Sequence, residues 1–142
     1  MALAAAQVVD ALAARFATVA LSGGRAYTSR LHPLEEVDLP AWRITAESED
    51  VEISHIDGTN VHTLLVDCTG YVKATTDVDD AMHNLAAQGL TAALATPPLY
   101  GSQLQAIERE TTQEGQAQVG LIRIRIATQF YVRPEAPETI VT

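Results

Sequence analysis

Between residues 120 and 132 the chain reads GLIRIRIATQFYV, in which isoleucine alternates with arginine before the aromatic end. Successive side chains of a β-strand point to opposite faces, so this pattern predicts a strand with one apolar face and one arginine face. The chain has a formal net charge of -9. The arginine face must therefore meet either acidic groups of its own sheet or an acidic surface of another subunit.

The overall composition predicts one globular domain spanning residues 1–142. The 142 residues are 47% hydrophobic and 19% charged, which is enough apolar material for a core without a disulfide or a metal. The acidic balance disfavours capture of nucleic acid, because a phosphate backbone would be repelled by most of the surface. Asp10 and Arg15 interrupt the apolar opening segment, so we expect neither a membrane span nor an export signal. We therefore expect a cytosolic protein.

Two amphipathic helices are predicted. The first covers residues 3–20 and ends before Ser22-Gly23-Gly24; its apolar stripe is Val9, Leu12, Ala13, Phe16 and Val19. The second opens at Thr76, whose hydroxyl we expect to cap it, and ends at Pro97-Pro98; its stripe begins with Val78, Met82, Leu85 and Ala86. Residues 22–40 lack a period and are predicted to form a long loop or an extended arm.

Strands are predicted from residues 41, 51 and 60, and the last two form a hairpin at Asp57-Gly58. A turn centred on Gly58-Thr59 would place His55, Ile53 and Val51 opposite His62, Leu64 and Val66 respectively. A second hairpin joins residues 102–113 to 116–132. With Glu114-Gly115 as its loop, Ile107 lies opposite Ile122, and the buried face continues through Ile124, Ile126, Phe130 and Val132.

The reverse face of the second hairpin gathers charges of both signs. Glu108 and Glu110 lie on one strand, and Arg123 and Arg125 lie on the other as cross-strand or diagonal neighbours. One interpretation is a solvated ladder of ion pairs, which contributes little to stability. The other is an interface with an acidic neighbouring subunit, where arginine can form bidentate contacts.

No arrangement of residues predicts catalysis, a cofactor or a metal. The four histidines lack ligand spacing, and the most suggestive pair, His55 and His62, has no further ligand beside it. Asp77, Asp79 and Asp80 are explained by the positive end of a helix. Cys68 lies in an apolar run without a group that would activate its thiol, which favours packing. We therefore expect a protein that is not an enzyme.

The order of elements and a set of short motifs resemble the tail terminator proteins of long-tailed bacteriophages, the minor tail protein U family and its tail-completion relatives. The residues that carry the resemblance are Arg25–Tyr27, Leu39-Pro40, Asp77–Asp80, Ile107–Glu110, Glu114-Gly115 and Phe130-Tyr131. The resemblance implies an α+β domain in which two main helices pack on a mostly antiparallel sheet of about four to five strands.

The resemblance also implies a function. Members of that family form a ring, here expected to be a homohexamer, which caps the tail tube and ends its polymerisation. The ring presents the surface for head-tail joining, and DNA passes through its lumen without specific binding. The expected partners are the tail tube protein and a head-tail connector protein, with no membrane. The expected location is the head-proximal end of the tail in the virion, after assembly in the host cytoplasm.

Three hypotheses place residues in such a ring. Arg123 and Arg125, with Glu108 and Glu110, would form the subunit interface. Arg25, Tyr27, Leu31 and Leu34 on the arm would dock a partner, or pack on their own subunit. Acidic residues would line the lumen and repel phosphate, with Glu35, Glu36 and Asp38 as first candidates and Asp77, Asp79 and Asp80 as second. Two alternatives stay open: a head-side connector or completion protein, and a small α+β ligand-binding domain.

Overall fold

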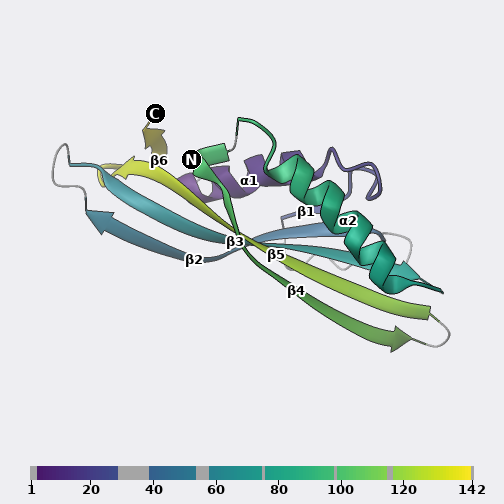
Figure 1. Cartoon of the computed structure of the whole chain (residues 1–142). Helices are drawn as coiled ribbons and strands as arrows, with labels where there is room; N and C mark the ends of the chain where they lie inside the picture. Colours follow the sequence, from purple (N-terminus) through teal and green to yellow (C-terminus); the bar gives the residue numbers. More distant parts are fainter. Residues whose placement is uncertain are drawn as a thin grey trace.

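A long, twisted sheet forms the frame of the protein (Figure 1). The computed structural model describes residues 3–28, 39–53, 58–74, 76–97, 99–114 and 117–141. The order of elements is α1 (Ala4–Phe16), β1 (Ala26–Tyr27), β2 (Ala41–Ile53), β3 (Asn60–Ala74), α2 (Val78–Ala93), the 3-10 helix η2 (Leu99–Gly101), β4 (Gln103–Glu114), β5 (Ala117–Arg133) and β6 (Ala136–Val141).

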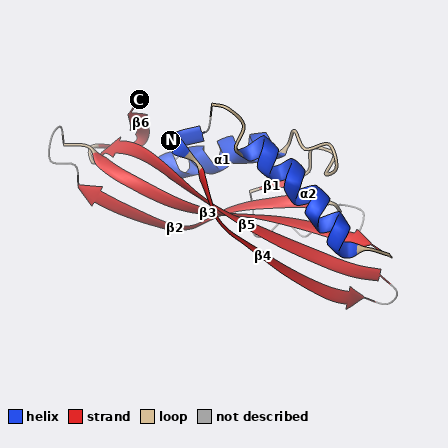
Figure 2. Cartoon of the chain, in the orientation of Figure 1, coloured by secondary structure: helices blue, strands red, loops and turns tan. Residues whose placement is uncertain are grey.

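The described sheet has six strands in the order β1-β2-β3-β5-β4, and β6 pairs with the end of β5. Only the short β1 runs parallel to its neighbour β2; the other described pairs are antiparallel. Both α-helices lie on one face of this sheet (Figure 2). The predicted fold class is therefore confirmed. The sheet has more strands than expected. β1 and β6 are short and show no alternation of apolar and polar residues, so the sequence pattern did not reveal them.

The core fills the space between the two helices and the sheet. Trp42 at its centre is fully buried and meets Phe16 of α1 with ring centroids 4.5 Å apart. Gly89 lets α2 approach, since a Cβ there would lie 2.5 Å from Cζ2 of Trp42. The predicted helix stripes are buried, as is the isoleucine face of β5. These buried residues are Val9, Leu12, Ala13, Phe16, Val19, Val78, Met82, Leu85, Ala86, Ile122, Ile124, Ile126, Phe130 and Val132.

Both helices are shorter than predicted. α1 ends at Phe16 rather than at residue 20, and the chain continues in turns in which the backbone N–H of Val19 donates to the Phe16 carbonyl. Val19 stays buried in that turn, so its place in the apolar stripe did not require a helix. α2 begins at Val78, and its cap is Asp77 rather than the predicted Thr76.

The first hairpin corrects two predictions. Residues 41–53 form one strand with a bulge between Ala46 and Ser48, not two separate strands. The predicted register is wrong by four residues, because Ile53 pairs with Asn60 rather than Leu64, and Val51 pairs with His62 rather than Val66. β2 ends at Ile53 and β3 begins at Asn60, so the paired strands stop before the turn that was predicted to join them. The prediction for His55 and Asp57 lies outside the described residues.

The second hairpin is displaced by two residues from its prediction. Ile107 pairs with Ile124 rather than with Ile122, and Glu114 pairs with Ala117, so the strands are joined through 115–116 rather than 114–115. A bulge between Leu104 and Ala106 changes the pairing further along the strands. An even displacement keeps each side chain on its predicted face, which is why the buried isoleucines were still identified.

The β2–β3 hairpin projects from the body of the protein. The first five residues of β2 lie in or near the core, and the last eight are exposed. In Figure 1 this end of the sheet extends past α1. None of the described helices is long and apolar enough to span a membrane.

Candidate functional site

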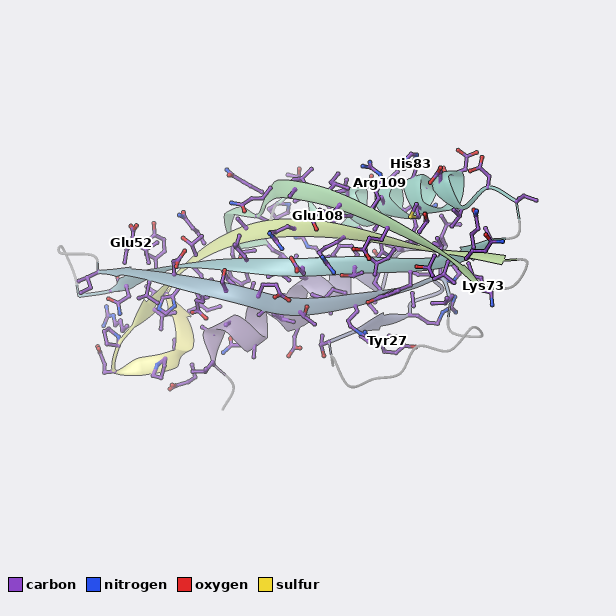
Figure 3. The ribbon with its side chains drawn as sticks, turned by 90° about the horizontal axis from the view of Figure 1, so that it is seen from below. Tyr27, Glu52, Lys73, His83, Glu108 and Arg109 are labelled. Atoms are coloured by element: carbon purple, nitrogen blue, oxygen red, sulfur yellow. The ribbon has the colours of Figure 1, made fainter. Side chains whose placement is uncertain are left out.

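The face of the sheet opposite the helices is the candidate site. Figure 3 views the chain from that side. Because both described α-helices lie on the other face, the side chains here are covered by no helix of the described residues. We call this surface the open face. It carries the odd-numbered residues of β5, which pair across to β3 on one side and β4 on the other.

A cluster of ion pairs lies at the middle of the open face. Arg125 Nε donates to Asp67 Oδ1 at 2.9 Å, and Arg123 Nε lies 3.8 Å from Asp67 Oδ2. Arg123 also donates from Nη1 to Glu108 Oε2 at 3.3 Å. The hydrogen bond to Asp67 and its charge raise the pKa of the Arg125 guanidinium above its ordinary value. The arginine face therefore meets acidic groups of its own sheet.

Asp67 is the central member of this cluster, and sequence analysis did not select it. It lies directly across from Arg125 in the sheet, and its side chain is only 9% exposed, whereas each arginine side chain is 34% exposed. The available signal was a single carboxylate within the apolar run LLVDCTG. Glu108 was predicted and does pair with Arg123, while Glu110 lies across from Leu121.

Further basic residues occupy the same half of the open face. The Arg43 guanidinium lies 5.6 Å from the ring centroid of Tyr71, within range of a cation–π contact. Lys73 follows two residues after Tyr71, which places it on the same face of β3. Thr45 and Thr69 are buried between these side chains and the ion-pair cluster.

The described part of the predicted docking arm packs on its own chain. Arg25 Nε donates to the Pro40 carbonyl at 3.1 Å, and the Arg25 carbonyl accepts from Trp42 N at 2.9 Å. Tyr27 belongs to β1, where it pairs with Arg43. The remaining candidates of the arm and of the first lumen set lie outside the described residues: Leu31, Leu34, Glu35, Glu36 and Asp38.

The second lumen set occupies the exposed first turn of α2. Asp77 accepts a hydrogen bond from Asp80 N at 3.0 Å, which satisfies one of the free N–H groups of the helix. Asp79 and Asp80 follow within the first turn. All three carboxylates are exposed, and helix capping accounts for their clustering.

His62 and Cys68 have structural contacts of their own within the described ranges. His62 contacts the carboxylate of Glu49 and stacks on Phe130 at a centroid distance of 5.3 Å. Among the described residues, no group of three potential ligands could hold a metal ion. Cys68 is buried, and burial raises the pKa of its thiol well above the ordinary value.

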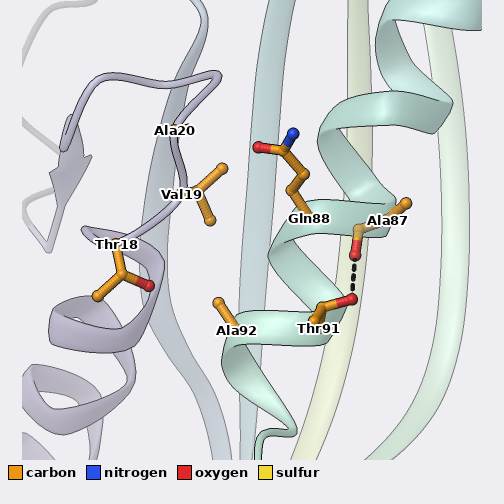
Figure 4. Close-up of a pocket in the computed structure, with 7 residues that line it drawn as sticks. All are labelled: Thr18, Val19, Ala20, Ala87, Gln88, Thr91 and Ala92. Carbon is orange, nitrogen blue, oxygen red and sulfur yellow. Dashed lines mark hydrogen bonds between the residues drawn. The ribbon is translucent and has the colours of Figure 1, made fainter.

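Two open hollows lie on the helix side of the chain. The larger, of about 490 Å³, lies between the turn after α1 and the outer surface of α2 (Figure 4). Within it Thr91 Oγ1 donates to the Ala87 carbonyl at 2.8 Å, as the dashed line marks. Among the described residues its lining contains no titratable side chain, and Asp10 is the only such residue in the lining of the second hollow. Neither hollow brings an acid, a base and a nucleophile of the described chain together.

No protein-family model matches the chain, and no curated protein sequence matches it. A chain of a solved structure described as "Virion of native gene transfer agent (GTA) particle" is similar, with a TM-score of 0.47 and 15% identity. The match covers 89% of this chain and 92% of that chain. A likeness at this TM-score and identity transfers no function to the chain.

Proposed function

We propose that the chain is a structural protein of a phage-like virion, and that it caps the tail tube as a homohexameric ring. The observation that carries the proposal is the open face, a large sheet surface with paired charges and a projecting hairpin. Protein interfaces draw their specificity from such complementary charges and their affinity from buried apolar anchors. The motifs shared with tail terminator proteins support the same assignment.

In this role the chain acts by binding to another protein assembly, the end of the tail tube, which serves as its template. The ring sits on the last ring of tube protein, ends tube polymerisation and presents a surface to the head-tail connector. DNA passes through the lumen, and exposed acidic groups such as Asp79 and Asp80 at the start of α2 would repel its phosphates. The protein then resides at the head-proximal end of the tail.

Negative-stain electron microscopy of the purified full chain, alone and mixed with tail tube protein from the same particle, tests the proposal. We expect six-fold rings, or caps on tube ends. Rings that bind isolated heads but not tubes would instead assign a head-side connector. A chain that stays monomeric with tubes present would contradict both assignments and favour a ligand-binding domain.

A further inference from the structure

The charges of the open face are unevenly distributed along the sheet. Residues 46–66, which include the projecting hairpin, contain no lysine or arginine. We call the described part of this segment, residues 46–53 and 58–66, the acidic hairpin. Its exposed acidic side chains all come from the last eight residues of β2: Asp50 and Glu52 lie on the open face, Glu47 lies at the bulge, and Glu49 contacts His62 on the helix side. One exposed basic residue, Arg133 at the end of β5, lies at the same end of the sheet. Asp50 and Glu52 pair with Thr63 and Val61 on β3.

The other half of the sheet carries four basic residues on the same face: Arg43, Lys73, Arg123 and Arg125. We call this set the basic face. Asp67 is buried beneath the two β5 arginines, so it compensates part of their charge from below rather than presenting a negative surface. Glu108 and Glu110 lie on β4 at one edge of the basic face, while Arg43 and Lys73 lie toward β2 and β3.

The outer part of the acidic hairpin, at Glu52, and the outer part of the basic face, at Lys73, lie at opposite ends of one molecule, and Arg123 and Arg125 lie between them. In Figure 3 the labels of Glu52 and Lys73 mark these two ends. Asp50 and Glu52 therefore cannot reach Lys73 of the same molecule, although Glu47, at the inner end of the hairpin, acts on the charge of Arg125. Those of a second copy can, because that copy brings an acidic hairpin to the basic face of the first and leaves its own basic face available for a third.

Apolar groups accompany the charges on both surfaces. Tyr131 of β5 is 48% exposed and lies across from Val61 of β3. Val61 in turn pairs with Glu52 of β2, the neighbouring strand on its other side. At the opposite end of the open face, Tyr71 and Leu121 lie half-buried beside the basic residues and pair with each other. Burial of apolar side chains between matched charges is the usual composition of a specific protein interface.

We propose that the acidic hairpin of one copy docks on the basic face of the next copy, toward the β2 and β3 side and away from Glu108 and Glu110. This contact joins two different surfaces, so it is heterologous and repeats from copy to copy, as a closed ring requires. The local match of charge would allow copies of a chain with a net charge of -9 to associate. The inference rests on the proposed ring and names the surfaces that build it.

Charge reversal on each surface tests the contact in the full chain. The hairpin variant is Asp50→Lys with Glu52→Lys, and the face variant is Lys73→Glu with Arg123→Gln. The control, Asp10→Lys with Glu135→Lys, changes the net charge as much as the hairpin variant does, at exposed sites elsewhere. Circular dichroism and thermal unfolding first establish that each variant is folded.

Sedimentation velocity then measures self-association. We expect each variant to raise the dissociation constant by at least about tenfold, while the control stays within about twofold of wild type. Mixing the hairpin and face variants should restore assembly, because the two lysines introduced into the hairpin of one variant would meet the glutamate introduced into the basic face of the other. Wild-type assembly should also weaken between about 0.05 and 0.5 M salt.

Two results would overturn the inference: a hairpin variant that assembles as well as wild type, or a mixture that assembles no better than its two components. A wild-type chain that stays monomeric at every concentration and salt level would also overturn it. Failure of the proposed function is a separate outcome. In that case assembly responds to charge as described, but the rings do not bind tubes in the electron micrographs.

Discussion

At the scale of single residues, Asp67 organises the charged centre of the open face. Its carboxylate accepts from Arg125 at 2.9 Å and lies near Arg123, while the strand pairs on both sides hold it in place. A buried acceptor that bonds a charged donor is costly to replace, whereas an exposed ion pair is worth little. Two carboxylates of the same cluster should therefore differ in their contribution to stability.

We predict that Asp67→Asn lowers the free energy of unfolding by about 1–2 kcal/mol, because the charge opposite two arginines is lost while the amide keeps a similar shape. Glu108→Gln is the matched control, since Glu108 meets Arg123 at 3.3 Å with a side chain that is 57% exposed. Its expected cost is below about 0.5 kcal/mol. Urea unfolding measures both. Equal costs would contradict the central role of Asp67.

At the scale of elements, polar side chains form hydrogen bonds at the ends of the two helices. Arg15 of α1 donates to the carbonyls of Ala95 and Pro97 at 2.7 and 2.6 Å, which connects α1 to the chain that follows α2. At the other end of α2, Asp77 supplies the cap. The Arg15 contacts help to hold α1 beside the end of α2, whereas the Asp77 cap is local to α2.

The identity of the α2 cap leads to a prediction at this scale. Asp77→Ala should lower the unfolding free energy by about 1 kcal/mol, because it removes the acceptor for Asp80 N and a negative charge at the helix N-terminus. Thr76→Ala should change it by less than about 0.5 kcal/mol. Thermal unfolding of the two variants compares them directly. If Thr76→Ala lowered the unfolding free energy more than Asp77→Ala does, the Thr76 hydroxyl would be the cap after all.

At the scale of the whole molecule, the sheet is longer than the layer of helices that covers it. One half is a conventional two-layer core around Trp42, and the other extends as a hairpin in which β2 has exposed side chains on both faces. An element with few buried apolar contacts opens locally at a lower free energy than the core does. The projecting hairpin should therefore contain the least protected part of β2.

Hydrogen exchange measures this difference along one strand. At a concentration where the chain is monomeric, backbone amides of residues 48–53 should exchange at least about tenfold faster than those of residues 41–46. On assembly, protection of residues 48–53 should rise, because that segment docks on the next copy. Uniform exchange along β2 would contradict the first expectation, and unchanged exchange on assembly would contradict the second.

The sequence by itself determined which face each side chain occupies. Alternation of isoleucine and arginine in β5 and the stripes of both helices follow from the periods of strand and helix, and these residues have the predicted burial. Of the charged centre of the open face, Arg123, Arg125 and Glu108 were predicted. Any strand register displaced by an even number of residues keeps the same faces, so the pattern could not select the pairing.

Only the tertiary structure decided which residues meet across the sheet. The hairpins are displaced by four and two residues from their predicted registers, and β3 rather than β4 supplies the main partner of the arginines, Asp67. β1 and β6 exist because neighbouring strands offer them hydrogen bonds, not because their own residues alternate. Contacts between distant segments depend on how loops close and layers pack, which no local period encodes.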